Sequence, residues 1–292
     1  MIRTDLSTEK PRTLLFVGAH PDDETFAIGG TLAQYAAAGV KVFYACATRG
    51  EVGTADAESM KGFTSVGDMR WAELECAARK LGLSGVIHLG YRDSGMAGSA
   101  DNRHPDSMVM APLTEAAERI VKVMREVKPD VVITHDPLGG YRHPDHIATH
   151  RATVAAFQAV GDGSAFPEAG PAFQPQKLYF NVFPRGWLKI AVKLMPLFGQ
   201  NPHKFGRNHD IDITGLVETE FPVHARVRLN PRSVAIRADA TACYKSQTGG
   251  GPPRRGLFRL INTFSVQQDS YMRAHPEVKG RLREKDLFTG IR

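Results

Sequence analysis

The stretch at residues 13–48, TLLFVGAHPDDETFAIGGTLAQYAAAGVKVFYACAT, decides the fold. Its apolar run at 13–19 predicts a β-strand, and residues 25–38 predict an amphipathic helix that Gly39 can close. Residues 40–48, VKVFYACAT, predict a second strand. A strand, a helix and another strand in this order predict a parallel pair joined by a right-handed crossover.

The same alternation continues outward from this stretch. Further elements are predicted in this order: a helix at 68–81 closed by Gly82, a strand at 86–89, a helix at 113–127 that ends before Pro129, a strand at 131–135, a helix at 147–160 and a strand at 177–182. Alternating strands and helices predict a sheet with helices on both faces. The fold class is therefore α/β, with a Rossmann-like, mostly parallel sheet flanked by helices.

The pattern weakens after Gly161. Residues 161–176 and the GGGPPRR segment at 249–255 are typical of loops, whereas residues 231–244 favour a helix. The apolar segment 187–198, WLKIAVKLMPLF, could be a lid, a partner surface or a peripheral membrane contact, but ordinary packing is favoured. We predict one domain over residues 1–292, with a catalytic core at about 13–160. A less regular C-terminal part, at about 161–292, would complete the pocket.

Composition and charge narrow the function classes. The chain has 292 residues, of which 42% are hydrophobic and 23% are charged, so a sizeable core is expected. The net charge of +6 favours an anionic ligand, but no nucleic-acid-binding signature is visible, so no nucleic-acid partner is predicted. No apolar run approaches the roughly 20 residues of a transmembrane helix, and the N-terminus lacks an apolar signal core. A cytoplasmic location is expected, and a homo-oligomer is compatible with the sequence.

Three scattered cysteines, Cys46, Cys76 and Cys243, give no regular pattern. They predict neither a disulfide framework nor a Cys-x-x-Cys metal site. Cys46 and Cys76 fall within predicted apolar elements and are interpreted as small core residues. A metal site in this chain would therefore use histidine and carboxylate ligands.

Two polar segments follow predicted strands and have the composition of a metal site. They are AHPDDE at 19–24 and YRHPDH at 141–146. The carboxyl ends of parallel strands lie at one edge of a sheet, so segments about 120 residues apart can meet there. His20, Asp23 and His146 would supply three ligands to Zn²⁺ and leave a fourth position for water. Bound zinc lowers the pKa of that water towards about 7.

The neighbouring residues suit the other steps of a hydrolysis. Asp22 is predicted to be the general base. His143 could remain protonated and stabilise a developing oxyanion, and Asp145 could orient a histidine. The alternative for Asp22 or Asp23 is a cap of the following helix, which is a common role for aspartate.

These residues make the chain resemble the LmbE-like, or PIG-L, family of zinc-dependent de-N-acetylases, whose Ala-His-Pro-Asp-Asp-Glu and His-Pro-Asp-His motifs are both intact. The resemblance implies zinc ligation by His20, Asp23 and His146, with Asp22 as base and His143 stabilising the tetrahedral intermediate. It also implies that Tyr141 polarises the carbonyl. Substrate contacts are implied for three residues: Glu51, in the loop at 48–53, Arg70 and Asp93. The alternative for Arg70 is a solvated arginine on the surface of its helix. The segments at 93–95 and 139–141 look most like the branch of the mycothiol pathway.

The leading hypothesis is hydrolysis of the N-acetyl amide of an N-acetylglucosaminyl compound, which releases acetate and the free amine. One alternative is an amidase acting on a larger amino-sugar thiol conjugate, and another is a sugar-binding protein without catalysis. Two histidines and one carboxylate also occur in non-haem iron oxygenases, and Fe²⁺ could replace zinc in a hydrolase. A Rossmann oxidoreductase is disfavoured, because no Gly-x-Gly-x-x-Gly follows the first strand.

Overall fold

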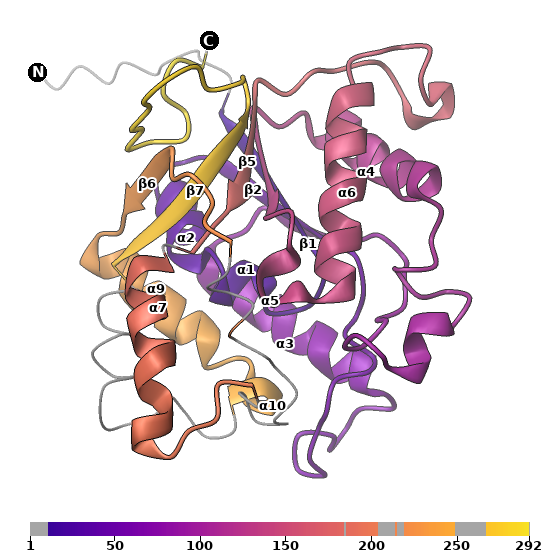
Figure 1. Ribbon diagram of the computed structural model, residues 1–292. Helices are drawn as coiled ribbons and strands as arrows, with labels where there is room; N and C mark the ends of the chain where they lie inside the picture. The colour runs from indigo at the N-terminus through magenta and orange to yellow at the C-terminus, as the bar shows by residue number, and fades with distance from the viewer. Residues whose placement is uncertain (1–10, 184, 204–213, 215–218, 249–266, 292) are drawn as a thin grey trace, which may run out of the picture.

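The computed structural model describes residues 11–183, 185–203, 214, 219–248 and 267–291. In this part of the chain, seven strands form one sheet in the order β3-β2-β1-β4-β5-β7-β6 (Figure 1). The five strands from β3 to β5 are parallel, whereas β7 pairs antiparallel with both β5 and β6. The strands are β1 (Thr13–Gly18), β2 (Lys41–Cys46), β3 (Gly85–His88), β4 (Val131–His135), β5 (Lys177–Asn181), β6 (Ala225–Arg228) and β7 (Gln268–His275). The predicted α/β class and mostly parallel sheet are confirmed.

Helices cover both faces of the sheet (Figure 1). Successive residues of β1 point to opposite sides, so Leu15 and Val17 join a core beneath α4 (Leu113–Val127) and α6 (Pro144–Ala159). Leu14 and Phe16 join the core on the other face, which carries three helices: α2 (Gly29–Ala37), α3 (Val66–Leu81) and α9 (Pro231–Thr241). The continuous burial of β1 and β4 is typical of central parallel strands.

One predicted helix, at 25–38, is instead two helices. α1 (Asp23–Phe26) ends at Ala27, and Ile28 has non-helical angles before α2 begins. Gly30 packs closely on the residue that follows β6, since a Cβ there would clash with a methyl carbon of Leu229. Gly29 and Gly30 have low helix propensity, so the local sequence does not favour a continuous helix here. The packing of this segment therefore determines where α2 begins.

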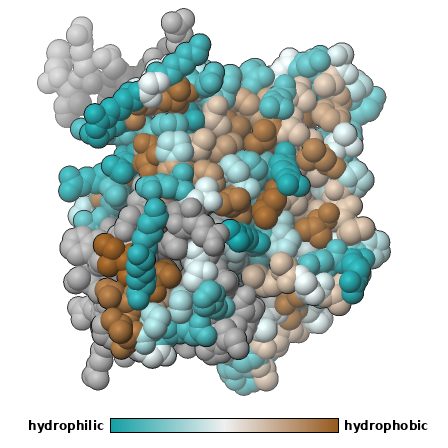
Figure 2. Space-filling model, viewed as in Figure 1, coloured by the Kyte–Doolittle hydropathy of each residue, from teal (hydrophilic) through white to brown (hydrophobic). Residues whose placement is uncertain are grey.

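The C-terminal part is more regular than the sequence predicted. It contributes β6 and β7, which were not predicted, and α9 matches most of the helix expected at 231–244. The segment at 187–198 forms most of α7 (Arg185–Leu194) and the 3₁₀ turn η3 (Met195–Phe198). Figure 2 shows hydrophobic surface over α7. The predicted loop at 249–255 lies outside the described residues.

The interpretation of the cysteines was wrong for one pair. Cys76 of α3 forms a disulfide with Cys243, which follows α9, across 167 residues of sequence. The packing of α9 on α3 brings the two together, and spacing alone could not reveal this contact. Cys46 is free and buried, as expected. No helix among the described residues is both long and apolar enough to cross a membrane.

Candidate active site

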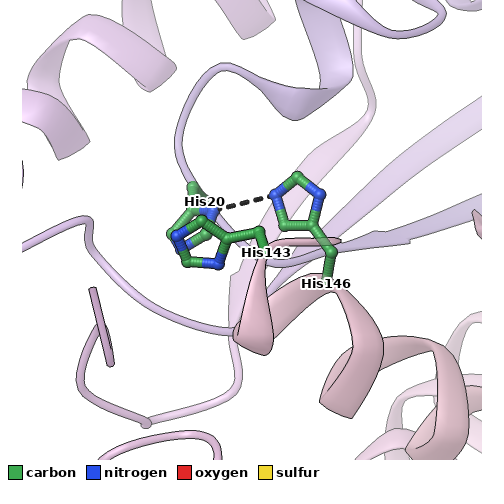
Figure 3. A group of neighbouring side chains, drawn as sticks. All are labelled: His20, His143 and His146. Atoms are coloured by element: carbon green, nitrogen blue, oxygen red, sulfur yellow. Dashed lines mark hydrogen bonds between the residues drawn. The ribbon is translucent and has the colours of Figure 1, made fainter. Parts of the chain in front are cut away.

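The two polar segments meet at the carboxyl edge of the sheet, as predicted. His20 follows β1, while His143 and His146 come from the start of α6, beyond β4 (Figure 3). His143 is the N-cap of α6, and the helix begins at Pro144, three residues before the predicted start. This earlier start fixes His146 on the first turn of a helix, with its ring toward His20.

The ring of His146 lies between two other potential metal ligands. Its Nε2 is 3.2 Å from Nδ1 of His20 and 3.4 Å from Oδ1 of Asp23. Tetrahedral zinc with bonds of about 2.0–2.1 Å separates its ligand atoms by about 3.4 Å. Among the residues that the structure describes, three groups of buried side chains bring their ligand atoms within 4.8 Å of one another, and His146 belongs to one group with His20 and to another with Asp23. Each of these groups can hold a metal ion, and His146 is the residue that links the group of His20 to the group of Asp23, since none of the three contains both.

Buried carboxylates contact Nε2 of His20, the ring nitrogen that does not face His146. Its Nε2 lies 3.1 Å from Oδ2 of Asp145 and 3.5 Å from Oδ1 of Asp93. The same Asp145 oxygen accepts a hydrogen bond from the backbone N–H of Ser94. A carboxylate on the far nitrogen fixes the orientation of a metal-binding histidine. Asp145 thus occupies the position that the predicted orienting role requires.

Asp23 is held in its ionised form. Its Oδ2 accepts hydrogen bonds from the backbone N–H groups of Ala19 and His20, which leaves Oδ1 facing His146. Burial opposes ionisation, but His146 and His135 hold the pKa of Asp23 well below its usual value. Because the carboxylate of Asp23 is turned toward these partners, it does not cap α1. The side chain of Asp22, which is the N-cap residue of α1, makes no capping hydrogen bond either.

His135 is a site residue that the sequence analysis missed. Its Nε2 lies 3.2 Å from Oδ2 of Asp23, and its ring stacks on His146 at 4.0 Å and 11°. The residue is buried at the end of β4. A histidine at the carboxyl end of a central parallel strand is the signal that could have identified it.

Asp22 lies beside the cluster in an unusual backbone conformation. Its φ of 119° is in the left-handed region, which residues other than glycine rarely adopt. Its Oδ2 accepts a hydrogen bond of 2.8 Å from Arg70, and its side chain keeps 17% of its surface exposed. Burial raises the pKa of Asp22 to about 7, although Arg70 favours the ionised form. A partly exposed carboxyl with this pKa can accept a proton near neutral pH.

His143 is neutral rather than protonated at pH 7. Burial, together with the nearby His20, lowers its pKa to about 3. Its Nδ1 accepts a hydrogen bond from the backbone N–H of Asp145, so the proton of the neutral ring belongs on Nε2. This lowered pKa favours a neutral His143 that donates from Nε2, whereas the sequence analysis expected a charged ring.

The ring of Tyr141 completes this side of the site. It meets the rings of His143 and His146 edge to face, at 5.8 and 5.3 Å. Burial raises the pKa of Tyr141 well above its usual value, so the hydroxyl stays protonated and can donate a hydrogen bond.

The three predicted substrate contacts have partners inside the protein. Arg70 also donates a hydrogen bond of 2.6 Å to the carbonyl of Pro21. Asp93 is 4% exposed and accepts hydrogen bonds from the backbone N–H groups of Gly95 and Val52. Glu51 accepts one from the N–H of Asp93. In this state they order the loops around the site, and their contact with substrate stays a prediction.

Comparisons with known proteins agree with the motifs. A family model described as GlcNAc-PI de-N-acetylase matches residues 15–157. A protein of Rhodococcus erythropolis named 1D-myo-inositol 2-acetamido-2-deoxy-alpha-D-glucopyranoside deacetylase is 36% identical, with 97% of this chain and 99% of the relative covered. One of the same name from Streptomyces avermitilis is 33% identical over 96% and 97% of the two chains. N,N'-diacetylchitobiose deacetylase from Pyrococcus horikoshii is similar in structure, with a TM-score of 0.60 at 20% identity, covering 90% and 83%.

Proposed function

The chain belongs to the GlcNAc-PI de-N-acetylase family, and from this premise we propose that it hydrolyses the N-acetyl amide of an N-acetylglucosaminyl compound. The products would be acetate and the free amine. The observation that carries the proposal is the meeting of the two motif segments, with His146 Nε2 within 3.4 Å of both His20 and Asp23.

The relatives support a particular substrate. Two of them, similar over nearly their whole length, are named for the inositol-linked amino sugar, so 1D-myo-inositol 2-acetamido-2-deoxy-α-D-glucopyranoside is the substrate that we propose. The family model matches this chain only as far as residue 157, whereas the similarity to these relatives continues into the C-terminal part. This continued similarity supports the assignment.

Zinc is the metal that we propose, held by His20, Asp23 and His146. The donor set of two imidazoles and one carboxylate fits catalytic zinc, and Fe²⁺ is the alternative ion for the same ligands. When bound, zinc would polarise the amide carbonyl and acidify a water molecule. The orientation of His20 by Asp145 supports ligation through Nδ1.

Residues of the chain would then supply the proton transfers. Asp22 would take the proton of the attacking water, and it could deliver that proton to the leaving amine. The N–H on Nε2 of His143 and the hydroxyl of Tyr141 would donate hydrogen bonds to the carbonyl oxygen as negative charge develops on it. A neutral His143 suits this role, because it can donate a hydrogen bond without first taking up a proton close to the zinc cation.

The first test is release of primary amine by zinc-loaded protein from a panel of N-acetylglucosamine conjugates. The panel holds the free sugar and its inositol-linked, lipid-linked and thiol-conjugate forms. We expect release from the inositol-linked form, abolished by a chelator and restored by zinc. Cleavage of the thiol conjugate alone would favour the amidase. Binding without release by metal-loaded protein would favour a sugar-binding protein.

A pair of variants tests the division between base and ligand. Asp22→Ala is expected to keep bound zinc but to lose at least about 100-fold in kcat, because only the proton acceptor is removed. His146→Ala is expected to lose zinc affinity itself. Metal content by elemental analysis and turnover are measured on both. Equal metal loss in the two variants would place Asp22 among the ligands.

Location and assembly remain proposals from the sequence. A cytoplasmic enzyme is proposed, and a disulfide such as Cys76–Cys243 is uncommon in a reducing compartment. Thiol labelling in intact cells would show the state of this pair. Ile190 and Leu197 expose apolar surface on the segment at 187–198.

A further inference from the structure

The base Asp22 is held from two sides by elements that lie far apart in the sequence. On one side, Arg70 of α3 donates to its carboxylate and to the carbonyl of Pro21. On the other side, the backbone N–H of Asp22 donates a 3.1 Å hydrogen bond to Oε2 of Glu24. A residue with φ of 119° needs such support, since left-handed backbone is unfavourable for an aspartate.

Glu24 is in turn positioned by the C-terminal part of the chain. Its carboxylate is fully buried, and its Oε1 accepts a 2.7 Å hydrogen bond from the hydroxyl of Tyr244. The Tyr244 ring is itself fully buried and lies 5.5 Å from the ring of Phe26 in α1. Tyr244 therefore reaches the first motif through a chain of two hydrogen bonds, Tyr244 to Glu24 and Asp22 to Glu24.

Tyr244 is anchored to the same helix that carries Arg70. The residue before it, Cys243, forms the disulfide with Cys76 of α3. Two residues after it, Ser246 donates through both its N–H and its hydroxyl to the carboxylate of Glu73, also on α3. Residues 243–246 and α3 are thus joined to each other, and they reach Asp22 by two routes: α3 directly, through Arg70 and the side chain, and Tyr244 indirectly, through Glu24 and the backbone N–H.

We infer that Tyr244, acting through Glu24, is a positioning residue that holds Asp22 in the orientation required for proton transfer. The inference rests on the proposed function, in which Asp22 is the base. It also means that the catalytic site is not complete within residues 15–157, which the family model matches. The C-terminal segment would be needed for the rate of the reaction as well as for the shape of the pocket.

The variant that tests this inference is Tyr244→Phe, which removes only the hydroxyl. Its matched control is Tyr35→Phe, because Tyr35 is another buried tyrosine whose hydroxyl donates a 2.7 Å hydrogen bond to a carboxylate, that of Asp286, away from the site. Zinc-loaded Tyr244→Phe is expected to lose about tenfold in kcat, with KM and zinc content unchanged, since misplacing a base lowers the rate without removing binding. Tyr35→Phe is expected to keep its kcat.

A second readout does not depend on any substrate. Hydrogen exchange of the Asp22 amide, which bonds to Glu24, is expected to become several-fold faster in Tyr244→Phe and to stay unchanged in Tyr35→Phe. If Tyr244→Phe folds poorly, Ser246→Ala is used instead. This variant removes a hydrogen bond that holds the same segment to α3 and leaves the buried Tyr244 ring unchanged, and it should also make exchange of the Asp22 amide faster.

Equal kcat and equal Asp22 exchange in the two tyrosine variants would overturn the inference. Loss of zinc in Tyr244→Phe would also overturn it, by assigning the residue to the metal site. If the wild-type protein deacetylates no compound of the panel while the exchange of Asp22 still responds to Tyr244→Phe, the proposed function fails and the positioning contact stands.

Discussion

At the scale of the residue, chemistry could be predicted and orientation could not. The ligand types of His20, Asp23 and His146 follow from two short motifs, whereas the support of His20 by Asp145 depends on a contact between segments 125 residues apart. The neutral state of His143 depends on burial and on the N-cap bond that the ring accepts. Neither can be read from spacing, because both arise from the way that the loops pack.

His150 of α6 provides a prediction about acid stability. It is 8% exposed, its Nδ1 donates to the carbonyl of His135, and burial lowers its pKa. As pH falls below about 6.5, the unfolded chain takes up a proton that the folded chain does not, so stability is lost with a slope of at most about 1.4 kcal/mol per pH unit. The stabilisation is therefore present above that pH and declines below it.

The measurement is the free energy of unfolding in urea at pH 7.5 and 5.5, for metal-free wild type and His150→Gln. Glutamine keeps a donor for the carbonyl but does not titrate in this range. We expect a smaller loss on acidification in the variant, and the remaining loss comes from other buried histidines. The same pH dependence in both proteins would show that His150 is not the source.

At the scale of the element, regular helices and central strands were predictable and joints were not. The helix at 113–127 and the strand at 131–135 match α4 and β4 to the residue, because their apolar periodicity and the proline after the helix are local signals. β6 was missed because the strand has only four residues, too few for its alternating burial to stand out in the sequence. β7 alternates poorly, with three consecutive buried residues followed by three partly buried ones. Long-range pairing, rather than local sequence, fixes these strands.

The joint between α5 (Gly139–Arg142) and α6 supports a prediction about the metal. Gly139 has φ of +64°, and a Cβ there would lie 2.8 Å from the Cβ of His146 and 2.9 Å from the backbone nitrogen of Ile147. Gly139→Ala should therefore displace His146 and weaken zinc binding by about tenfold or more, measured by competition with a chromogenic chelator.

Gly98→Ala is the matched control for this variant. Gly98 has a similar φ of +89° but nothing within 4 Å of the added atom, so its replacement introduces backbone strain without a clash. We expect zinc affinity to remain at the wild-type level in this control. An equal fall in both variants would attribute the loss to strain in general rather than to contact with His146.

At the scale of the whole molecule, the C-terminal part is joined to the catalytic core by contacts of several kinds. One is the Cys76–Cys243 disulfide, and another is a buried ion pair in which Lys177 of β5 donates to Glu284 at 2.8 Å. The composition predicted a large core, but the sequence could not predict these long-range partners. These contacts exist only in the folded protein, in which the C-terminal part packs against the catalytic core.

The disulfide supports a prediction about stability. Cys243→Ser is expected to lower the free energy of unfolding by about 2–5 kcal/mol, because the bond closes a long loop in the unfolded chain. Urea unfolding of the variant is compared with that of wild type before and after reduction by dithiothreitol. Reduced wild type should match the variant, and Cys46→Ala should keep its response to the reductant. A wild type indifferent to reduction would refute the prediction.

The position of β7 has a consequence for how the protein folds during its synthesis. This strand, at 268–275, pairs with β5 and β6 on either side, yet it follows every other described strand in the sequence. The ribosome must therefore synthesise the chain beyond residue 275 before β5 can obtain its antiparallel neighbour. Until then the nascent chain presents an open strand edge, which is the kind of surface that aggregates or recruits chaperones. Maturation of this enzyme should therefore depend on what protects that edge during translation.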